Sequence, residues 1–80
     1  MLRPKTEVSG AEVRAARKEM SRLERQIAKL AGREEKLHAQ MAEKATDHVA
    51  VGKLDTELRE ITAEKDALEE AWLEAAETAG

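Results

Sequence analysis

The ten residues from 43 to 52, EKATDHVAVG, interrupt the sequence between two long stretches of regularly spaced apolar residues. Thr46 and Asp47 are residue types that favour the N-cap of a helix, and Gly52 weakens the first turn of the helix that follows. We place a turn at about residues 45–49, and its HVAV segment suits a short piece of 3₁₀ helix. A connection this short makes the two flanking helices antiparallel neighbours.

Both flanking stretches have the apolar spacing of a coiled coil, because their apolar residues alternate three and four positions apart. In the first stretch these residues are Val13, Ala16, Met20, Leu23, Ile27, Leu30, Leu37 and Met41, and in the second they are Val51, Leu54, Leu58, Ile61, Leu68, Trp72 and Ala75. We expect helices over about residues 10–44 and 50–77. The predicted fold is all-α, a two-helix antiparallel coiled-coil hairpin over residues 10–77.

The predicted hairpin is preceded by residues 1–9, which include a proline and show no periodicity. We expect these residues to be a linker or disordered tail. Ser9 ends this segment and is followed three positions later by Glu12, the pattern of a helix N-cap. The first helix should therefore begin at about Gly10.

Each of these two apolar series, which we call the seams of the helices, is interrupted by one charged residue: Glu34 in the first and Lys65 in the second. The two charges favour one register of the hairpin over another. In an antiparallel hairpin the numbers of facing residues have a constant sum, and a sum of 95 brings Glu34 and Lys65 into adjacent layers. A slip of seven residues, to a sum of 88, separates these charges. We prefer 95, because such a pair adds little net stability but selects against slipped registers. Trp72 then faces Leu23, as a core residue near the open end of the hairpin.

Composition excludes several other ways of stabilising an 80-residue chain. Cysteine is absent, and His38 and His48 do not have the spacing of metal ligands, so we expect no disulfide, metal or other cofactor in this chain. Charged residues make up 39 % and hydrophobic residues 41 %, which is typical of a coiled coil. The chain has no apolar run of about 18 residues and no signal peptide. We therefore expect a cytoplasmic protein that does not contact a membrane.

Charge is distributed unevenly along the chain. Residues 1–36 contain ten basic and six acidic side chains, for a balance of +4, whereas residues 37–80 contain four and eleven, for −7. Basic residues of the first helix gather on the face away from the seam, and we call them the basic stripe. Its members are Arg14, Lys18, Arg22, Arg25, Lys29, Arg33 and Lys36. At 1.5 Å per residue the stripe is about 33 Å long.

The basic stripe has two interpretations, which we weigh equally. The simpler is a solvated helix face, the usual role of a charge run. However, four stripe residues have no acidic residue three or four positions away: Lys18, Arg25, Lys29 and Arg33. Neighbouring cations therefore repel each other by roughly a few tenths of a kcal/mol per pair. Phosphates along a nucleic-acid backbone would relieve this repulsion and would be bound with little sequence specificity.

The sequence has no pattern that indicates catalysis. Its four glycines are isolated, so no phosphate-binding loop is present and the chain alone cannot hydrolyse ATP. The carboxylates near the end of the second helix, Glu69, Glu70, Glu74 and Glu77, have no partner base. We therefore predict no catalytic residue and do not expect an enzyme.

Three segments together resemble a known family: RKEMSRLERQIAKLAGREEKLHAQM (17–41), ATDHVAV (45–51) and KLDTELREITAEKDALEEAWLEAAE (53–77). The ending LEEAWLEAAE is similar to the L/F-E-x-x-W-x-x-L-E ending of the C-terminal domain of ABC-F ATPases, in particular the Uup-like group of actinobacteria. This resemblance implies two upstream ATP-binding cassettes, which bind ATP and Mg²⁺, and action at the ribosome or on nucleic acids. It also implies a DNA-binding hairpin with a 3₁₀ element near its turn.

The residues and the resemblance together predict a module that binds DNA, ribosomal RNA or tRNA through the basic stripe and is joined in cis to ATPase cassettes. Because few apolar residues lie outside the seam, we expect a monomer. The acidic second helix departs from the family pattern and leaves only one side for nucleic acid. The alternative is a structural or protein-interaction spacer that docks or orients the ATPase modules without nucleic-acid contact.

Overall fold

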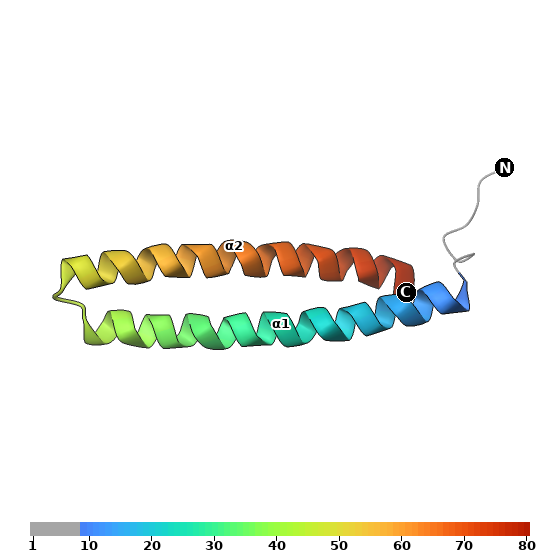
Figure 1. Ribbon diagram of the computed structural model, residues 1–80, viewed down its shortest axis with the longest axis horizontal. Helices are drawn as coiled ribbons and strands as arrows, with labels where there is room; N and C mark the ends of the chain where they lie inside the picture. Colours follow the sequence, from blue (N-terminus) through green and yellow to red (C-terminus); the bar gives the residue numbers. More distant parts are fainter. Residues whose placement is uncertain (1–8) are drawn as a thin grey trace.

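The computed structural model describes residues 9–80, which form one helical hairpin (Figure 1). Helix α1 spans Gly10–Glu43 and helix α2 spans His48–Ala79. With 34 and 32 residues, each helix is about 50 Å long, and the two lie antiparallel and side by side along most of that length. The predicted all-α class and two-helix hairpin are confirmed. Of the expected linker over residues 1–9, all but Ser9 lies outside the described residues.

Both helices begin at side-chain caps. The Ser9 hydroxyl accepts a hydrogen bond of 3.1 Å from the backbone N–H of Glu12 at the start of α1. The Asp47 carboxylate accepts one of 3.1 Å from the backbone N–H of Ala50 at the start of α2. Each cap satisfies a backbone donor that has no partner within its own helix. The N-cap role predicted for Ser9 is confirmed.

The turn is shorter and earlier than the sequence suggested. It occupies residues 44–47 instead of 45–49 and is closed by the backbone N–H of Asp47, which donates to the Lys44 carbonyl at 2.8 Å. The expected 3₁₀ piece at HVAV is wrong, because these residues form the first turn of α2. The backbone N–H of Val51 donates to the Asp47 carbonyl at 2.9 Å, four residues earlier, as in an α-helix. The cap at Asp47 thus allows an α-helical start directly after the turn.

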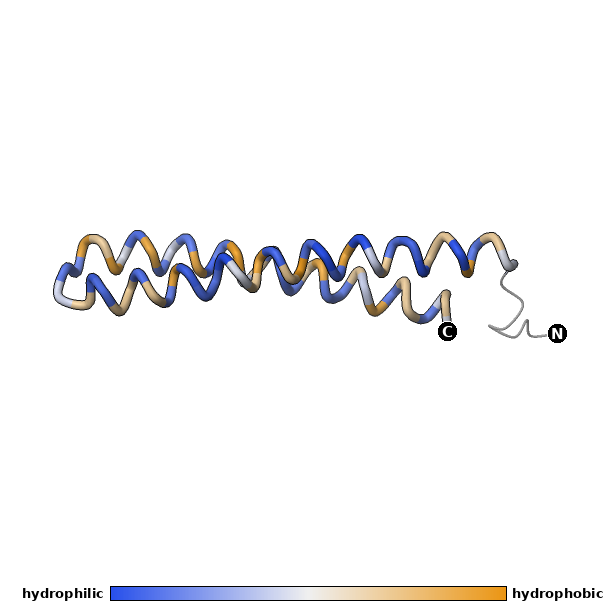
Figure 2. Tube along the Cα trace, turned by 90° about the horizontal axis from the view of Figure 1, so that it is seen from below, coloured by the Kyte–Doolittle hydropathy of each residue, from blue (hydrophilic) through white to orange (hydrophobic). Residues whose placement is uncertain are grey.

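The core is a thin layer between the helices, and it uses α1 more fully than α2. Among the described residues, α1 buries Ala16, Leu23, Leu30 and Leu37, whereas α2 buries Ile61 alone. The half-buried leucines of α2 that pack against this core are Leu54, Leu58 and Leu68. Figure 2 shows the apolar positions recurring turn after turn along both helices. The predicted seam therefore forms. Because each helix packs against only one other helix, most seam residues remain partly exposed to water.

Cross-helix contacts agree with the predicted register. The Lys65 ammonium donates to the Glu34 carboxylate at 2.7 Å, and the Thr62 hydroxyl donates to the same carboxylate at 3.2 Å. In the slipped register Glu34 would face Leu54, which lies about 16 Å along α2 from Lys65. The contact between Glu34 and Lys65 thus excludes the slip and confirms the ion pair.

The start of α1 and the end of α2 lie at the same end of the hairpin, opposite the turn (Figure 1). At that end α1 extends beyond the last turn of α2, so the first residues of α1 have no helix beside them. Neither α1 nor α2 combines the length and apolarity that a membrane crossing requires.

Candidate nucleic-acid interface

The basic stripe lies along the outer face of α1. Its members follow one another in steps of three or four positions, which keeps side chains on one face of an α-helix. Leu23 and Leu30, which are buried against α2, lie on the opposite face. All seven stripe residues are exposed: Arg14, Lys18, Arg22, Arg25, Lys29, Arg33 and Lys36. The structure thus gathers the predicted residues on one solvent-facing surface.

Arg22 is engaged by an acidic residue of its own helix. Its Nε and Nη2 atoms donate to Oε1 and Oε2 of Glu19, both at 2.7 Å. The hydrogen bond from Arg22 lowers the pKa of Glu19, and the same bond raises the pKa of Arg22. Both side chains are about half exposed, so the pair is readily opened by water or by a competing anion.

Arg33 is turned toward the second helix. Its Nη2 atom lies 3.6 Å from Oε1 of Glu57 on α2, and both side chains remain about half exposed. Within α1 no acidic residue lies three or four positions from Arg33, so the sequence predicts an uncompensated charge there. The contact with Glu57 corrects that expectation, so Arg33, like Arg22, is partly engaged by a carboxylate of the hairpin.

The other stripe residues form no ion pair with a second residue in the part of the chain that the structure describes. Two shallow hollows follow their surface. One is lined by Arg22, Arg25, Gln26, Ala28 and Lys29, and the other by Arg33, Lys36, Leu37, Gln40 and Glu57. The centre of the stripe therefore offers closely spaced cations around a concave surface, an arrangement suited to a phosphate group.

Two of the three basic residues of α2 are paired with carboxylates of the hairpin. Lys65 lies between the helices and is bound to Glu34, which raises the pKa of Lys65, and Arg59 pairs with Asp55 on α2 at 3.1 Å. The hydrogen bond from Lys65 lowers the pKa of Glu34, so both groups stay charged near neutral pH. Lys53 is exposed and has no ion pair within residues 9–80, so the cations that gather in a continuous row lie on α1, with one further cation on α2.

Neither histidine is a member of the basic stripe. His38 and His48 are both exposed, the first on α1 and the second at the start of α2. No group of three or more His, Cys, Asp or Glu side chains within residues 9–80 has an arrangement that could hold a metal ion.

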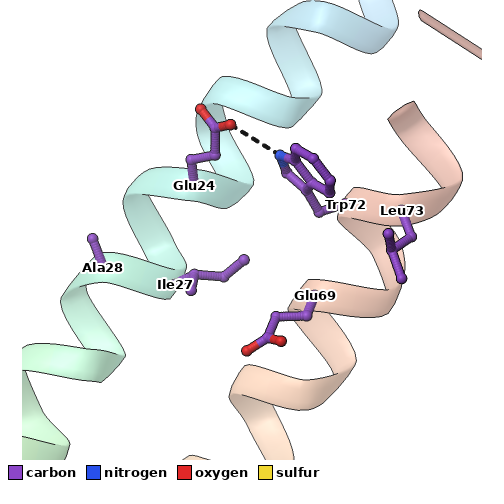
Figure 3. Close-up of a pocket in the computed structure, with 6 residues that line it drawn as sticks. All are labelled: Glu24, Ile27, Ala28, Glu69, Trp72 and Leu73. Atoms are coloured by element: carbon purple, nitrogen blue, oxygen red, sulfur yellow. Dashed lines mark hydrogen bonds between the residues drawn. The ribbon is translucent and has the colours of Figure 1, made fainter. Parts of the chain in front are cut away.

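Trp72 differs from its expected place in the core. It is half-buried, and its indole N–H donates to the Glu24 carboxylate at 3.1 Å. Figure 3 shows the indole extending from α2 toward Glu24 on α1. Trp72 lines an open groove together with Glu24, Ile27, Ala28, Glu69 and Leu73. Heptad spacing did not predict this groove. Leu73, directly after the seam position of Trp72, is the sequence signal that apolar surface continues outside the seam.

Comparison with known proteins adds one finding. Residues 13–77 match the family described as ABC transporter C-terminal domain. No curated protein and no solved structure matches the chain. The matched segment begins three residues into α1 and ends two residues before the end of α2, so it covers nearly the whole hairpin.

Proposed function

Because the chain belongs to the ABC transporter C-terminal domain family, we propose that it is a non-catalytic nucleic-acid-binding module of an ABC-F ATPase. The basic stripe contacts the phosphates of DNA or of structured RNA, such as ribosomal RNA or tRNA. One observation carries the proposal. The centre and far end of the stripe hold Arg25, Lys29 and Lys36, which face solvent and form no ion pair with another described residue.

The rest of the proposal combines the sequence with the family membership. The module acts in the cytoplasm as a monomer, joined in cis to ATP-binding cassettes. Those cassettes hold ATP and Mg²⁺ and carry any hydrolysis, while the hairpin itself has no catalytic residue. Its contribution is to hold nucleic acid at a fixed place relative to the cassettes.

The charge distribution makes binding one-sided. Phosphates are attracted by α1 and repelled by α2, whose residues 66–80 include five carboxylates and no basic side chain. Contacts to phosphates position a protein without reading bases, so we expect little sequence preference. Since α1 is a straight helix with its core residues on the opposite face, its cations approach a ligand without rearrangement of the hairpin.

The test is a salt titration of binding to duplex DNA and to tRNA, measured by fluorescence anisotropy. Three substitutions are combined in one variant: Arg25→Glu, Lys29→Glu and Lys36→Glu. A matched control makes the same change of charge elsewhere: Lys44→Glu, Lys53→Glu and Arg59→Glu. If each substituted cation neutralises one phosphate of DNA, the slope of log affinity against log salt changes by about 2.7 in the first variant. The control should keep the slope of the unaltered chain.

Two results would overturn the proposal. One is that neither duplex DNA nor tRNA binds to the unaltered chain at low salt. The other is equal weakening in the two variants, because total charge would then account for binding without any contribution from the position of the stripe. Circular dichroism of each variant confirms that the hairpin remains folded.

A second candidate is a spacer or protein-interaction hairpin that docks or orients the ATPase modules without nucleic-acid contact. The contact between Arg33 and Glu57 favours it, since part of the stripe's charge is satisfied within the hairpin. In that case neither DNA nor tRNA binds, and the stripe serves solubility or pairing with acidic protein surfaces.

A further inference from the structure

An open groove lies between the helices near the free end of the hairpin. Ile27 and Ala28 of α1 and Leu73 of α2 provide its apolar lining, and Trp72 forms one side (Figure 3). Leu73 is 59 % exposed, which makes it one of two large apolar side chains in the described residues that face water to this degree. The groove has a volume of about 470 Å³, which is within the range of small ligand sites. It therefore has room for one large side chain and its neighbours.

The rim of this groove is acidic on both helices. Glu24 on α1 and Glu69 on α2 line it directly. On α2, Leu73 has a carboxylate four positions before it, another three before it and a third four after it, at Glu69, Glu70 and Glu77. Residues at these spacings are neighbours on a helix surface. An exposed leucine is thus surrounded by three negative charges.

These charges have little compensation within the hairpin. Glu24 has no basic residue three or four positions away on α1, and α2 has none after Lys65. The Lys65 ammonium could approach Glu69, but it is bound to Glu34 at 2.7 Å. Neither Glu24 nor Glu69 forms an ion pair with another residue of the described chain. The groove therefore attracts a cation as well as an apolar group.

We infer that this groove docks a basic amphipathic peptide segment of a partner protein. One large apolar side chain of the segment packs between Trp72 and Leu73, and a neighbouring Arg or Lys pairs with Glu24 or Glu69. The hydrogen bond from Trp72 to Glu24 holds the indole in place before the segment arrives. An arginine lying over the indole would add a cation–π contact.

Two other occupants fit less well. A second copy of the chain would bring two acidic ends together, since residues 66–79 of α2 carry five carboxylates and no basic side chain. Nucleic acid would place phosphates against the carboxylates of the rim. The groove adjoins the basic stripe, because Ala28 lines both this groove and the hollow of Arg25 and Lys29. Nucleic acid and a peptide would then occupy adjacent flanks of α1.

Trp72 gives a direct assay, because it is the one aromatic residue of the chain. The probe is the blocked peptide acetyl-ARKLLRKALA-amide, which has no fluorescence of its own at the wavelengths that excite tryptophan. We expect a saturable blue shift of Trp72 emission. Leu73→Ala and Glu69→Gln should each weaken the peptide about tenfold, the usual effect of removing a central contact. The matched controls Val49→Ala, at an exposed apolar residue near the turn, and Glu60→Gln should leave affinity unchanged.

Four results would overturn the inference. Equal peptide affinity in Leu73→Ala and Val49→Ala would show that the groove is not used. Equal binding of acetyl-ARKAARKAAA-amide, which lacks the leucines, would show attraction by charge alone. A concentration-dependent shift of Trp72 emission without peptide, with dimers in sedimentation, would identify a second copy as the occupant. Saturable quenching by single-stranded DNA would identify nucleic acid.

This inference stands independently of the proposed function. The variant of Arg25, Lys29 and Lys36 leaves the lining of the groove intact, so it should bind the peptide even where it has lost nucleic acid. Conversely, Leu73→Ala should keep the salt-dependent binding of DNA. Failure of one proposal is thus measured separately from failure of the other.

Discussion

Truncation of Leu23 to alanine should be among the most damaging single changes in the hairpin. Leu23 is 2 % exposed and is the most completely buried large side chain among the described residues. The substitution removes three carbon atoms from the core, at about 0.8 kcal/mol each, and adds a cavity term that a thin two-helix layer relieves in part by collapse. We expect a loss of about 3 kcal/mol in the free energy of unfolding, toward the low end of the range for buried leucines.

A loss of this size is large for so small a core. A domain of 80 residues has a total stability of about 4–12 kcal/mol. The assay is urea denaturation followed by circular dichroism, in which the midpoint should fall by about 2–3 M while the slope stays the same. Leu73→Ala is the control, since an exposed side chain should change stability by no more than about 0.5 kcal/mol. Equal losses in the two variants would refute the packing described above.

Three further changes follow from the helices and their contacts. Gly32→Ala should stabilise the hairpin by about 1 kcal/mol, measured by urea denaturation, because an added methyl group would meet no atom within 4 Å. Asp47→Ala should cost about 1 kcal/mol in the same measurement, through loss of the hydrogen bond to the N–H of Ala50. Because the hydrogen bond from Lys65 holds the pKa of Glu34 below its ordinary value of 4.5, the pair stabilises the fold above that pH, and this contribution is lost as pH falls through the folded pKa. Denaturation at pH 7 and at pH 3 should show a smaller loss in Glu34→Gln than in the unaltered chain, and an equal loss would contradict the role of the pair.

The hairpin itself could be predicted because several local signals agree. Apolar spacing defines the seam, and Ser9 marks where α1 begins. Asp47 was among the expected cap residues, but α2 begins at His48, two residues before the expected start at about residue 50. The opposite charges of Glu34 and Lys65 then favour this register over the slip to a sum of 88, which separates them. Each of these signals depends on residues close in sequence or on the regular geometry of a helix. Each can therefore be interpreted from the sequence without knowledge of the tertiary structure.

Contacts of long side chains outside the seam could not be predicted in the same way. The Arg33 guanidinium reaches Glu57, and the Trp72 indole reaches Glu24, through rotamers that heptad spacing does not specify. The 3₁₀ piece was wrong for a related reason, since the carbonyl and carboxylate of Asp47 both accept backbone hydrogen bonds that start α2 as a regular helix.

The common position of the start of α1 and the end of α2 has a mechanical consequence. A hairpin held at that end is a stiff lever with its turn at the tip. A rotation of about 10° around the base would carry the turn through about 9 Å over a helix of this length. Lys36, near the turn, would move several times farther than Arg14, near the base. A small rotation at the base would therefore produce a large displacement at the far end of the hairpin.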